Sequence, residues 1–127
     1  MKHKVPNVSF KVRELGEWVT KTSDDFFKGK RVIVFGLPGA FTPTCSTYQL
    51  PGFEDNYPQM RELGVDEVYC ISVNDAFVMN AWADYLDIKN VKVIPDGNGE
   101  FADSLGMFID MSAVGFGKRS RRFAVVL

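Results

Sequence analysis

The chain has 127 residues and a mass of 14.3 kDa, which is the size of a single domain built around one hydrophobic core. Hydrophobic residues make up 46% of it, which excludes a disordered chain. Its net charge of -1 creates no positive electrostatic field that would attract nucleic acid or anionic lipid. We therefore expect no nucleic-acid partner and no membrane partner. No apolar run approaches the roughly 20 residues that span a bilayer, and residues 1–6 lack the apolar stretch of a secretion signal. The expected location is the cytoplasm.

The side chains available for catalysis are few. His3 is the only histidine and stands near the terminus, which argues against Ser-His and Cys-His nucleophile pairs. Cys45 and Cys70 are the only cysteines, too few for a structural zinc site or a disulfide-stapled domain. We expect no metal and no cofactor. A cysteine that acts here must be activated by something other than histidine.

The first third of the chain predicts a hairpin, a short helix and a buried strand. Residues 8–12 alternate polar and apolar side chains, as in a strand. Gly16 is suited to a turn, and residues 18–20 can form the second strand, so the sequence predicts an N-terminal β-hairpin. Residues 23–27 open with cap-type side chains and predict one helical turn. Residues 31–35 are an apolar, β-branched run, which predicts a central strand buried on both faces.

A long helix is expected next, over residues 42–63. Thr42 is the predicted N-cap, and Pro43 occupies the first helical position, where a missing N–H costs nothing. Pro51 and Pro58 lie inside this range and are expected to kink or interrupt the helix, because proline cannot donate the helical hydrogen bond.

The remaining elements complete an alternation of strands and helices. Residues 65–73 predict a second buried strand, followed by a capped helix whose buried face is formed by Val78, Ala81, Trp82, Tyr85 and Leu86. Residues 91–94 predict a third strand and residues 100–105 a short helix, whereas the glycine-bearing stretch up to Gly117 is expected to be loop. Residues 122–127 predict a last strand. This order indicates an α/β fold with parallel central strands in one domain over residues 1–127.

The most informative segment joins the first buried strand to the start of the long helix. In α/β sheets, the carboxyl end of a strand is where functional residues gather. With Thr42 as N-cap, Cys45 falls in the first helical turn, where free N–H groups and the helix dipole favour an anion. A thiolate is such an anion, so Cys45 is the candidate nucleophile.

Pro38, Thr42 and Cys45 are separated by three and by two residues. This spacing matches the active-site pattern of the peroxiredoxins, which the sequence closely resembles. The similarity is to the peroxiredoxin-5 subfamily, above all to bacterial members that include glutaredoxin-fused hybrids, and it runs from about Val5 to the last residue. The motifs that carry it are residues 34–46, 50–53, 72–82, 94–101 and 115–120 and the arginine before Phe123.

The resemblance implies a thioredoxin-like fold, in which a mixed central sheet is flanked by helices. It implies that Cys45 attacks a hydroperoxide and becomes a sulfenic acid. The family pattern assigns charge stabilisation during O–O cleavage to Arg122, to the hydroxyl of Thr42 and to backbone N–H groups near the cysteine, and it assigns shielding from water to Pro38. It also implies a homodimer and an outside recycling thiol, which is glutathione, glutaredoxin or thioredoxin.

Charge stabilisation is expected to matter more for the rate than ionisation of the thiol. An unperturbed thiol is only about 3% ionised at pH 7, so full ionisation accelerates attack by roughly thirtyfold. A helix N-terminus contributes about 0.3 to 1 kcal/mol, whereas one charge at about 4 Å contributes on the order of 4 kcal/mol at an effective dielectric constant of 20. We therefore expect Arg122 to outweigh the helix dipole, since its planar fork can contact thiolate and peroxide together.

Simpler structural interpretations apply to several of these residues. Thr42 is an N-cap in either case, and Pro38 taken alone is a turn residue. Cys70 lies in an apolar run and is expected to be buried and inert. The other basic residues near the last strand are expected to form a solvated face: Lys118, Arg119 and Arg121. Three aromatic residues are expected to divide between the core and the dimer contact beside the active site: Phe41, Phe77 and Phe116.

Domains of the similar subfamily continue for about another strand and helix beyond the position of Leu127. We therefore expect this chain to be truncated at its C-terminus, with that strand and helix absent and the last strand lying uncovered beside residues 32–35. The alternative function is a non-enzymatic redox sensor or interaction module that uses the same oxidisable cysteine. A general thiol oxidoreductase is a third possibility, weakened because no Cys-x-x-Cys motif is present.

Overall fold

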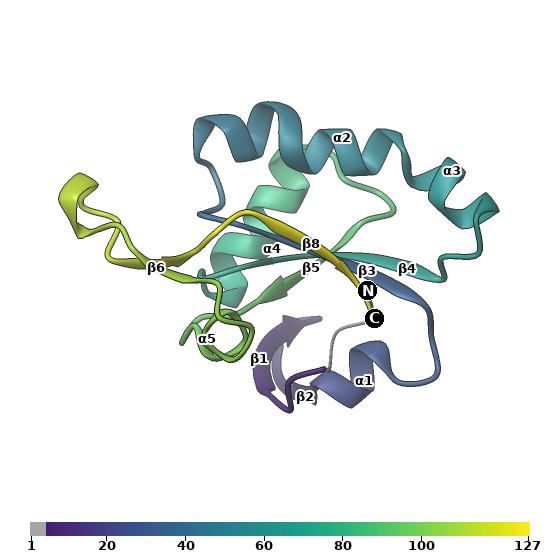
Figure 1. The fold of residues 1–127 in the computed structure, drawn as a ribbon, viewed down its shortest axis with the longest axis horizontal. Coiled ribbons are helices and arrows are strands. Elements are labelled where there is room, and N and C mark those ends of the chain that lie inside the picture. Colours follow the sequence, from purple (N-terminus) through teal and green to yellow (C-terminus); the bar gives the residue numbers. More distant parts are fainter. Residues whose placement is uncertain (1–4) are drawn as a thin grey trace.

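The computed structural model describes residues 5–127, and a four-stranded sheet forms its centre (Figure 1). The strand order is β5, β4, β3, β8, with bounds Lys92–Pro95, Glu67–Ser72, Val32–Leu37 and Phe123–Val126. Strands β3, β4 and β5 are parallel, and β8 runs antiparallel to β3. The predicted α/β class and mixed sheet are confirmed. The argument against histidine-based catalysis rested on His3, which lies outside the described residues.

Strand β3 is buried on both faces, as its apolar run predicts. Because side chains alternate along a strand, Val32 and Val34 pack on one face of the sheet, while Phe35 and Leu37 pack on the other. Two separate hydrophobic cores result, one on each side of the sheet. A strand between two such cores needs apolar side chains at every position, which explains the unbroken run.

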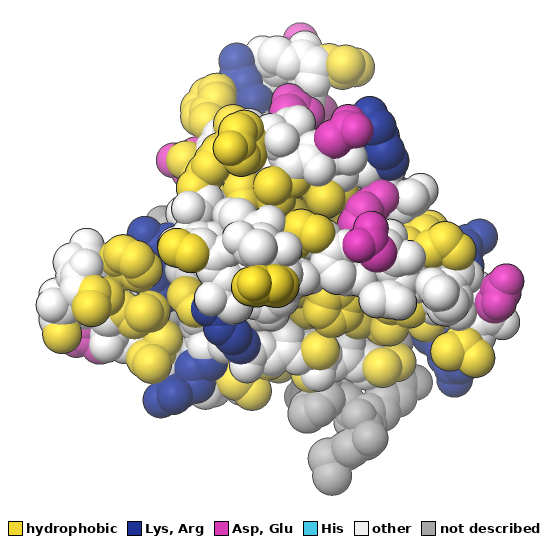
Figure 2. Space-filling model, turned by 90° about the horizontal axis from the view of Figure 1, so that it is seen from above, with side chains coloured by type: hydrophobic (Ala, Val, Ile, Leu, Met, Phe, Trp, Pro, Cys, Tyr) yellow, Lys and Arg dark blue, Asp and Glu magenta, His cyan; other side chains and the backbone are white. Residues whose placement is uncertain are grey.

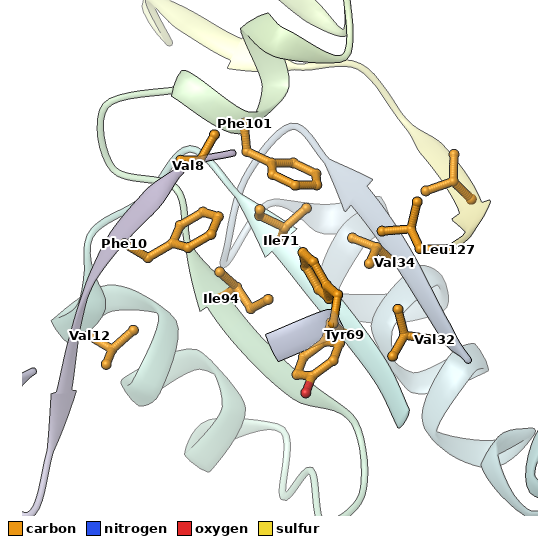
Figure 3. Close-up of a cluster of buried hydrophobic side chains, with 12 residues drawn as sticks. Val8, Phe10, Val12, Val32, Val34, Tyr69, Ile71, Ile94, Phe101 and Leu127 are labelled. Carbon is orange, nitrogen blue, oxygen red and sulfur yellow. The ribbon is translucent and has the colours of Figure 1, made fainter. Parts of the chain in front are cut away.

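The first core lies under an N-terminal hairpin and two short helices. The hairpin pairs β1 (Ser9–Glu14) with β2 (Glu17–Thr22), which confirms its prediction, and the helices are α1 (Ser23–Phe27) and α5 (Glu100–Ser104). Figure 3 shows Phe10 and Phe101 approaching the sheet residues of this core. Aromatic rings pack edge to face or tilted across the cluster, with centroids 5.5 to 6.0 Å apart for Phe10, Phe26, Phe27, Tyr69 and Phe101.

The helical stretch that follows β3 is broken into pieces, so the expectation of one long helix was wrong in detail. It begins at Pro43 and contains a π-helical segment η1 (Cys45–Gln49), then α2 (Leu50–Asp55) and α3 (Tyr57–Glu62). The Leu50 N–H donates to the carbonyl of Cys45, five residues back, immediately before Pro51. Pro51 and Pro58 each lie in the first turn of a helix, so the predicted interruptions are confirmed.

Helix α4 (Ala76–Tyr85) packs on the same side of the sheet, and its predicted face is confirmed in part, because Trp82, Val78 and Leu86 pack in this core while Ala81 and Tyr85 do not. Asp75 caps it by accepting the Val78 N–H at 2.9 Å. Met79 and Trp82 are its fully buried large side chains, whereas Tyr85 is 75% exposed and Ala81 is also exposed. The buried face follows a spacing of three from Ala76, because the helix approaches the sheet beside α2 and the loop after β3.

The stretch expected to be loop contains a small hairpin instead. Strand β6 (Phe108–Asp110) pairs with β7 (Lys118–Ser120), and the 3₁₀ turn η2 (Ser112–Val114) lies between them. This hairpin projects away from the sheet in Figure 1. Its strands have three residues each and no apolar alternation, so the sequence offers no periodic signal for them.

Two further features concern the molecular surface. None of the helices within residues 5–127 is long and apolar enough to cross a lipid bilayer. Seen from the side of α2 and α3, basic and acidic side chains are interspersed, with hydrophobic side chains in several patches between them (Figure 2). No single sign of charge covers this face of the molecule.

The helix that carries the active-site candidate is tied to the rest of the fold by Glu54 of α2. Its carboxylate accepts the backbone N–H groups of Asn90 at 3.0 Å and Val91 at 2.8 Å, together with the N–H of Lys89 and the side-chain amide of Asn90. Partial burial acts to raise the pKa of Glu54, but these hydrogen bonds outweigh it, so its pKa lies below the ordinary glutamate value. The charged form is therefore the one that stabilises the fold.

We expect Glu54→Gln to lower the melting temperature by about 3 to 5 °C near pH 7, because a neutral amide accepts these N–H groups more weakly than a carboxylate. The depressed pKa means that the stabilisation is present above the unfolded pKa, about 4.3, and is lost as the pH falls through the folded value. The difference between wild type and variant should therefore shrink below about pH 4.

Thermal unfolding followed by circular dichroism at both pH values checks this prediction. Glu62→Gln, at an exposed position of α3, is the matched control and should change the melting temperature little. A loss of the same size in both variants, or a loss from Glu54→Gln that does not depend on pH, would contradict it.

Candidate active site

The loop after β3 is fixed at the carboxyl ends of two parallel strands, where the sequence predicts the site. The Ala40 N–H donates to the side-chain oxygen of Asn74 at 3.0 Å, and the Ser72 hydroxyl donates to the same oxygen at 2.7 Å. Asn74 lies two residues after the end of β4, so one amide side chain joins the ends of β3 and β4. The loop is thereby held over the edge of the sheet.

Thr42 stands directly before the first helical residue, as predicted, but its hydroxyl does not act as the predicted cap. The Thr42 carbonyl accepts the Ser46 N–H at 3.0 Å, whereas Oγ1 donates to the carbonyl of Gly39 at 2.7 Å. Phe41, just before it, adopts a left-handed backbone with φ of 63°. A hydroxyl that donates to the loop keeps its lone pairs free to accept a hydrogen bond from another group.

Cys45 lies at the base of the helix, and its side chain is fully buried. Its sulfur is 3.2 Å from Nη1 of Arg122, which is 77 residues further along the chain. The structure thus brings together two residues that the sequence predicted for the site. Among residues 5–127, no carboxylate forms an ion pair with Arg122, so the guanidinium charge next to the sulfur is not neutralised.

The approach of Arg122 follows from the pairing of β8 with β3. Phe123 lies opposite Gly36 in the antiparallel register, and a Cβ atom on Gly36 would overlap the ring of Phe123. Glycine is therefore required at this position of β3. The Phe123 ring covers the strand, and the neighbouring Arg122 is carried to the helix beside it.

Gln49 is a residue of this site that the sequence reasoning missed. Arg122 donates through Nη1 to Oε1 of Gln49 at 2.6 Å, and Nε2 of Gln49 donates to the Gly36 carbonyl at 3.2 Å. The amide is thus held at both ends and orients the guanidinium toward Cys45. The sequence position of Gln49 could have identified it, because a residue four positions after Cys45 in a helix lies on the same face as the cysteine.

Trp82 of α4 fixes the helix from the other side. Its indole Nε1–H donates to the hydroxyl of Ser46 at 2.9 Å, and the ring is fully buried. Ser46 is next to Cys45, so this bond places the first turn of the helix against α4. A buried tryptophan N–H requires a partner, and here the partner comes from the active-site helix.

The expectation of a solvated basic face was wrong for Arg119. Lys118 and Arg121 are exposed, but Arg119 is half-buried. Its Nη1 donates to the carbonyls of Pro38 at 3.3 Å and Val73 at 3.5 Å, and its Nε donates to the Phe116 carbonyl at 3.1 Å. Pro38, half-buried at the end of β3, is thus held by a residue from the β6–β7 hairpin.

Cys70 lies in β4 and is fully buried, as expected, in the same core as Cys45. Burial raises the pKa of the Cys70 thiol well above its ordinary value, and the nearby Cys45 sulfur raises it further. Both cysteines are free thiols. Cys70 is therefore held in its protonated, less nucleophilic form.

A buried thiol with an unneutralised guanidinium at hydrogen-bond distance is suited to nucleophilic attack followed by stabilisation of negative charge. Within residues 5–127 no three histidine, cysteine, aspartate or glutamate side chains gather into a metal-binding group. The reactive group that this site presents is the sulfur of Cys45, with the Arg122 guanidinium as the donor next to it.

Comparisons with known proteins point to the same chemistry. The sequence model of the Redoxin family matches residues 2–127. A peroxiredoxin of Rhizobium etli is 52% identical over 136 residues, which cover 100% of this chain and 76% of that protein. The hybrid peroxiredoxin hyPrx5 of Haemophilus influenzae is 48% identical over 124 residues, which cover 98% of this chain and 52% of that protein.

Among solved structures, the reduced Prx3 of Vibrio vulnificus in complex with hydrogen peroxide superposes with a TM-score of 0.92 at 36% sequence identity. The match covers 98% of this chain and 78% of that one. The similarity in sequence and in fold extends over nearly the whole chain. This chain therefore belongs to the Redoxin family and, within it, to the peroxiredoxins, which are thiol peroxidases.

Proposed function

We propose that Cys45 is the peroxidatic cysteine of this thiol peroxidase. The Cys45 sulfur attacks the terminal oxygen of a hydroperoxide, an S–O bond forms, and the O–O bond breaks. The cysteine is oxidised to a sulfenic acid, and the leaving oxygen takes a proton to become an alcohol, or water when the substrate is hydrogen peroxide. The observation that carries the proposal is the 3.2 Å contact between this sulfur and Nη1 of Arg122.

Arg122 is proposed to stabilise the reaction at both reacting centres. Negative charge moves from the sulfur to the leaving oxygen as the O–O bond breaks, so a fixed cation that touches both lowers the barrier. Gln49 supports this role, because it restricts a long side chain that is otherwise exposed. Without such a partner, ordering an arginine side chain costs about 2 kcal/mol of rotamer entropy.

Thr42 is proposed to bind the peroxide, and Pro38 is proposed to shield the Cys45 sulfur from water. The Thr42 hydroxyl donates to Gly39, so its lone pairs can accept a hydrogen bond from the peroxide O–H. Pro38 is half-buried at the start of the same loop and presents a ring without an N–H donor. Exclusion of water strengthens the electrostatic contribution of Arg122.

A thiol from another molecule is proposed to reduce the sulfenic acid. One thiol displaces the hydroxyl oxygen as water and forms a mixed disulfide with Cys45, and a second thiol releases the cysteine by disulfide exchange. Cys70 is protonated and buried in the core, which argues against it as the partner. Glutathione, glutaredoxin and thioredoxin are the candidate reductants, and the cytoplasm is the proposed location, because thiols stay reduced there.

A homodimer is proposed, with exposed aromatic side chains at its interface. Phe41 and Tyr85 form one aromatic pair at 5.8 Å, and Phe77 forms another with Trp18 at 5.3 Å. Phe41 is 51% exposed and Phe77 is 56% exposed, so the expectation that some of these rings pack in the core finds no support from them. Large exposed aromatics beside an active site are typical of a protein contact.

Replacing Cys45 by serine should abolish consumption of hydrogen peroxide, because an alcohol is not ionised near pH 7. Cys70→Ala is the matched control and should retain turnover within about twofold, since the sulfur it removes is buried and protonated. The measurement is steady-state peroxide consumption with glutathione and glutaredoxin, or with thioredoxin and its reductase, as the recycling system. Equal loss in both variants would refute the proposal, and a single turnover without recycling would favour a redox sensor.

Arg122→Lys should lower the second-order rate with hydrogen peroxide by about a hundredfold, because lysine keeps the charge but loses the planar fork. Alkylation of Cys45 by iodoacetamide should change much less, since that reaction does not break an O–O bond. Stopped-flow kinetics and mass spectrometry of the Cys45 peptide measure the two rates. A wild-type peroxide rate in this variant would show that the guanidinium has no special role.

Phe77→Glu should shift the protein from dimer to monomer at micromolar concentration, because burying an unpaired carboxylate at an interface is costly. The side chain lies in the first turn of α4 and near Arg13, so the monomer tolerates the acid. Leu63→Glu, at a position 78% exposed beyond the end of α3, is the control and should leave the dimer intact. Sedimentation velocity measures whether the wild type and the two variants are monomers or dimers. A monomeric wild type would overturn the proposed dimer.

A further inference from the structure

Arg119 links three separate segments that surround the active-site loop. Its guanidinium donates to Pro38 after β3 and to Val73 after β4, while its Nε donates to Phe116 within its own hairpin. The guanidinium also stacks 5.5 Å from the centre of the Phe116 ring. One half-buried side chain therefore connects the β6–β7 hairpin with the ends of two central strands.

The acceptors of Arg119 are backbone carbonyls. Within residues 5–127, no carboxylate forms an ion pair with Arg119. An exposed ion pair would contribute little, whereas charge-assisted bonds to partly buried carbonyls fix backbone geometry. Lysine lacks an Nε–H and the planar fork, so it cannot make the same set of bonds.

The contact between Arg119 and the loop leaves no room for a side chain at Gly39. A Cβ atom placed there would lie 2.7 Å from Nη1 of Arg119 and 3.4 Å from the methyl group of Thr42. The side chain of residue 39 is thus excluded by the guanidinium on one side and by the active-site threonine on the other. The carbonyl of this same glycine accepts the Thr42 hydroxyl, so a shift of the loop would move that hydroxyl as well.

We propose that Arg119 is a positioning residue of the peroxidase reaction, which holds the Pro38–Thr42 loop in the geometry that receives the peroxide. This inference rests on the proposed role of Cys45. Arg119 acts through the loop, whereas Arg122 contacts the sulfur directly. Arg119 lies in β7 and Arg122 lies in the short connection between β7 and β8, so one short segment carries both the residue that holds the loop and the charge next to the sulfur.

The inference distinguishes two reactions of the same sulfur. Attack on a peroxide requires the Thr42 hydroxyl and the loop backbone in register with Arg122, and a displacement near 1 Å can cost up to about a hundredfold. Alkylation by iodoacetamide reaches the same buried sulfur when it becomes transiently exposed, and it requires the ionised sulfur but no aligned O–O bond. Loss of a positioning residue should therefore lower the peroxide rate selectively.

The test is the ratio of the two rates in Arg119→Met, which keeps an unbranched side chain without its donors. We expect the second-order rate with hydrogen peroxide to fall about tenfold and the iodoacetamide rate at Cys45 to change by less than about twofold. Arg119→Lys should recover little of the peroxide rate, because charge alone does not restore the bonds. Arg121→Met is the matched control, since Arg121 is exposed and two residues away, and it should behave as wild type.

Gly39→Ala provides an independent route to the same displacement. The new methyl group would push aside the flexible end of Arg119, so the fold should be retained while the peroxide rate falls by a similar factor. The double variant Gly39→Ala/Arg119→Met should be no slower than the slower single variant, because both disrupt one contact. Additive losses would indicate two unrelated effects and overturn the proposal.

Two outcomes separate this inference from the proposed function. If Cys45→Ser is inactive while Arg119→Met and Gly39→Ala keep the wild-type ratio of rates, the positioning role is wrong and the role of Cys45 stands. If Cys45→Ser still consumes peroxide, the proposed function itself fails. A fall of both rates by the same factor, together with a lower melting temperature, would show that Arg119 only stabilises the fold.

Discussion

The contact between the Arg122 guanidinium and the Cys45 sulfur is the central interaction of the candidate site, and the constraint that produces it is the pairing of β8 with β3. The two residues are separated by 77 positions and meet at 3.2 Å because β8 runs antiparallel beside β3 while the helix carrying Cys45 begins just after β3. Gly36 permits the close approach of the Phe123 ring that fixes this register. The sheet thus delivers a cation to the base of a helix, where thiolate chemistry is favoured.

Neutral acceptors surround both arginines of the site. Arg122 donates to the amide oxygen of Gln49, and Arg119 donates to backbone carbonyls. A carboxylate in either position would fix the geometry equally well but would cancel the positive charge near the sulfur. An amide and a carbonyl provide orientation and leave the charge available for the anion that, in the proposed mechanism, forms during O–O cleavage. Geometry and electrostatics are therefore supplied by the same contacts.

The active-site helix combines local irregularity with firm attachment. Its π-helical first segment and its prolines disrupt the regular hydrogen-bond ladder, so propensity alone does not hold it. Tertiary contacts replace that stability, through the Trp82 indole on Ser46, the Gln49 amide on Gly36 and the Glu54 carboxylate on the loop before β5. Each contact is a hydrogen bond between the helix and another element, so the position of Cys45 follows from the folded core and not from the helix itself.

Features that depend on a local pattern could be predicted from the amino-acid sequence alone. The apolar run of β3, the N-terminal hairpin, the placement of Thr42 and Cys45 at a strand-to-helix junction and the α/β class all follow from periodicity, capping and turn chemistry within short windows. The choice of Arg122 among neighbouring basic residues came from the resemblance to a family. The burial of Met79 instead of Tyr85 on α4, the β6–β7 hairpin and the contacts of Gln49 and Arg119 became visible only in the folded structure. Gln49 contacts a guanidinium and a backbone carbonyl, and Arg119 contacts carbonyls as far as 81 residues away; a contact between such distant polar groups leaves no periodic trace in the sequence.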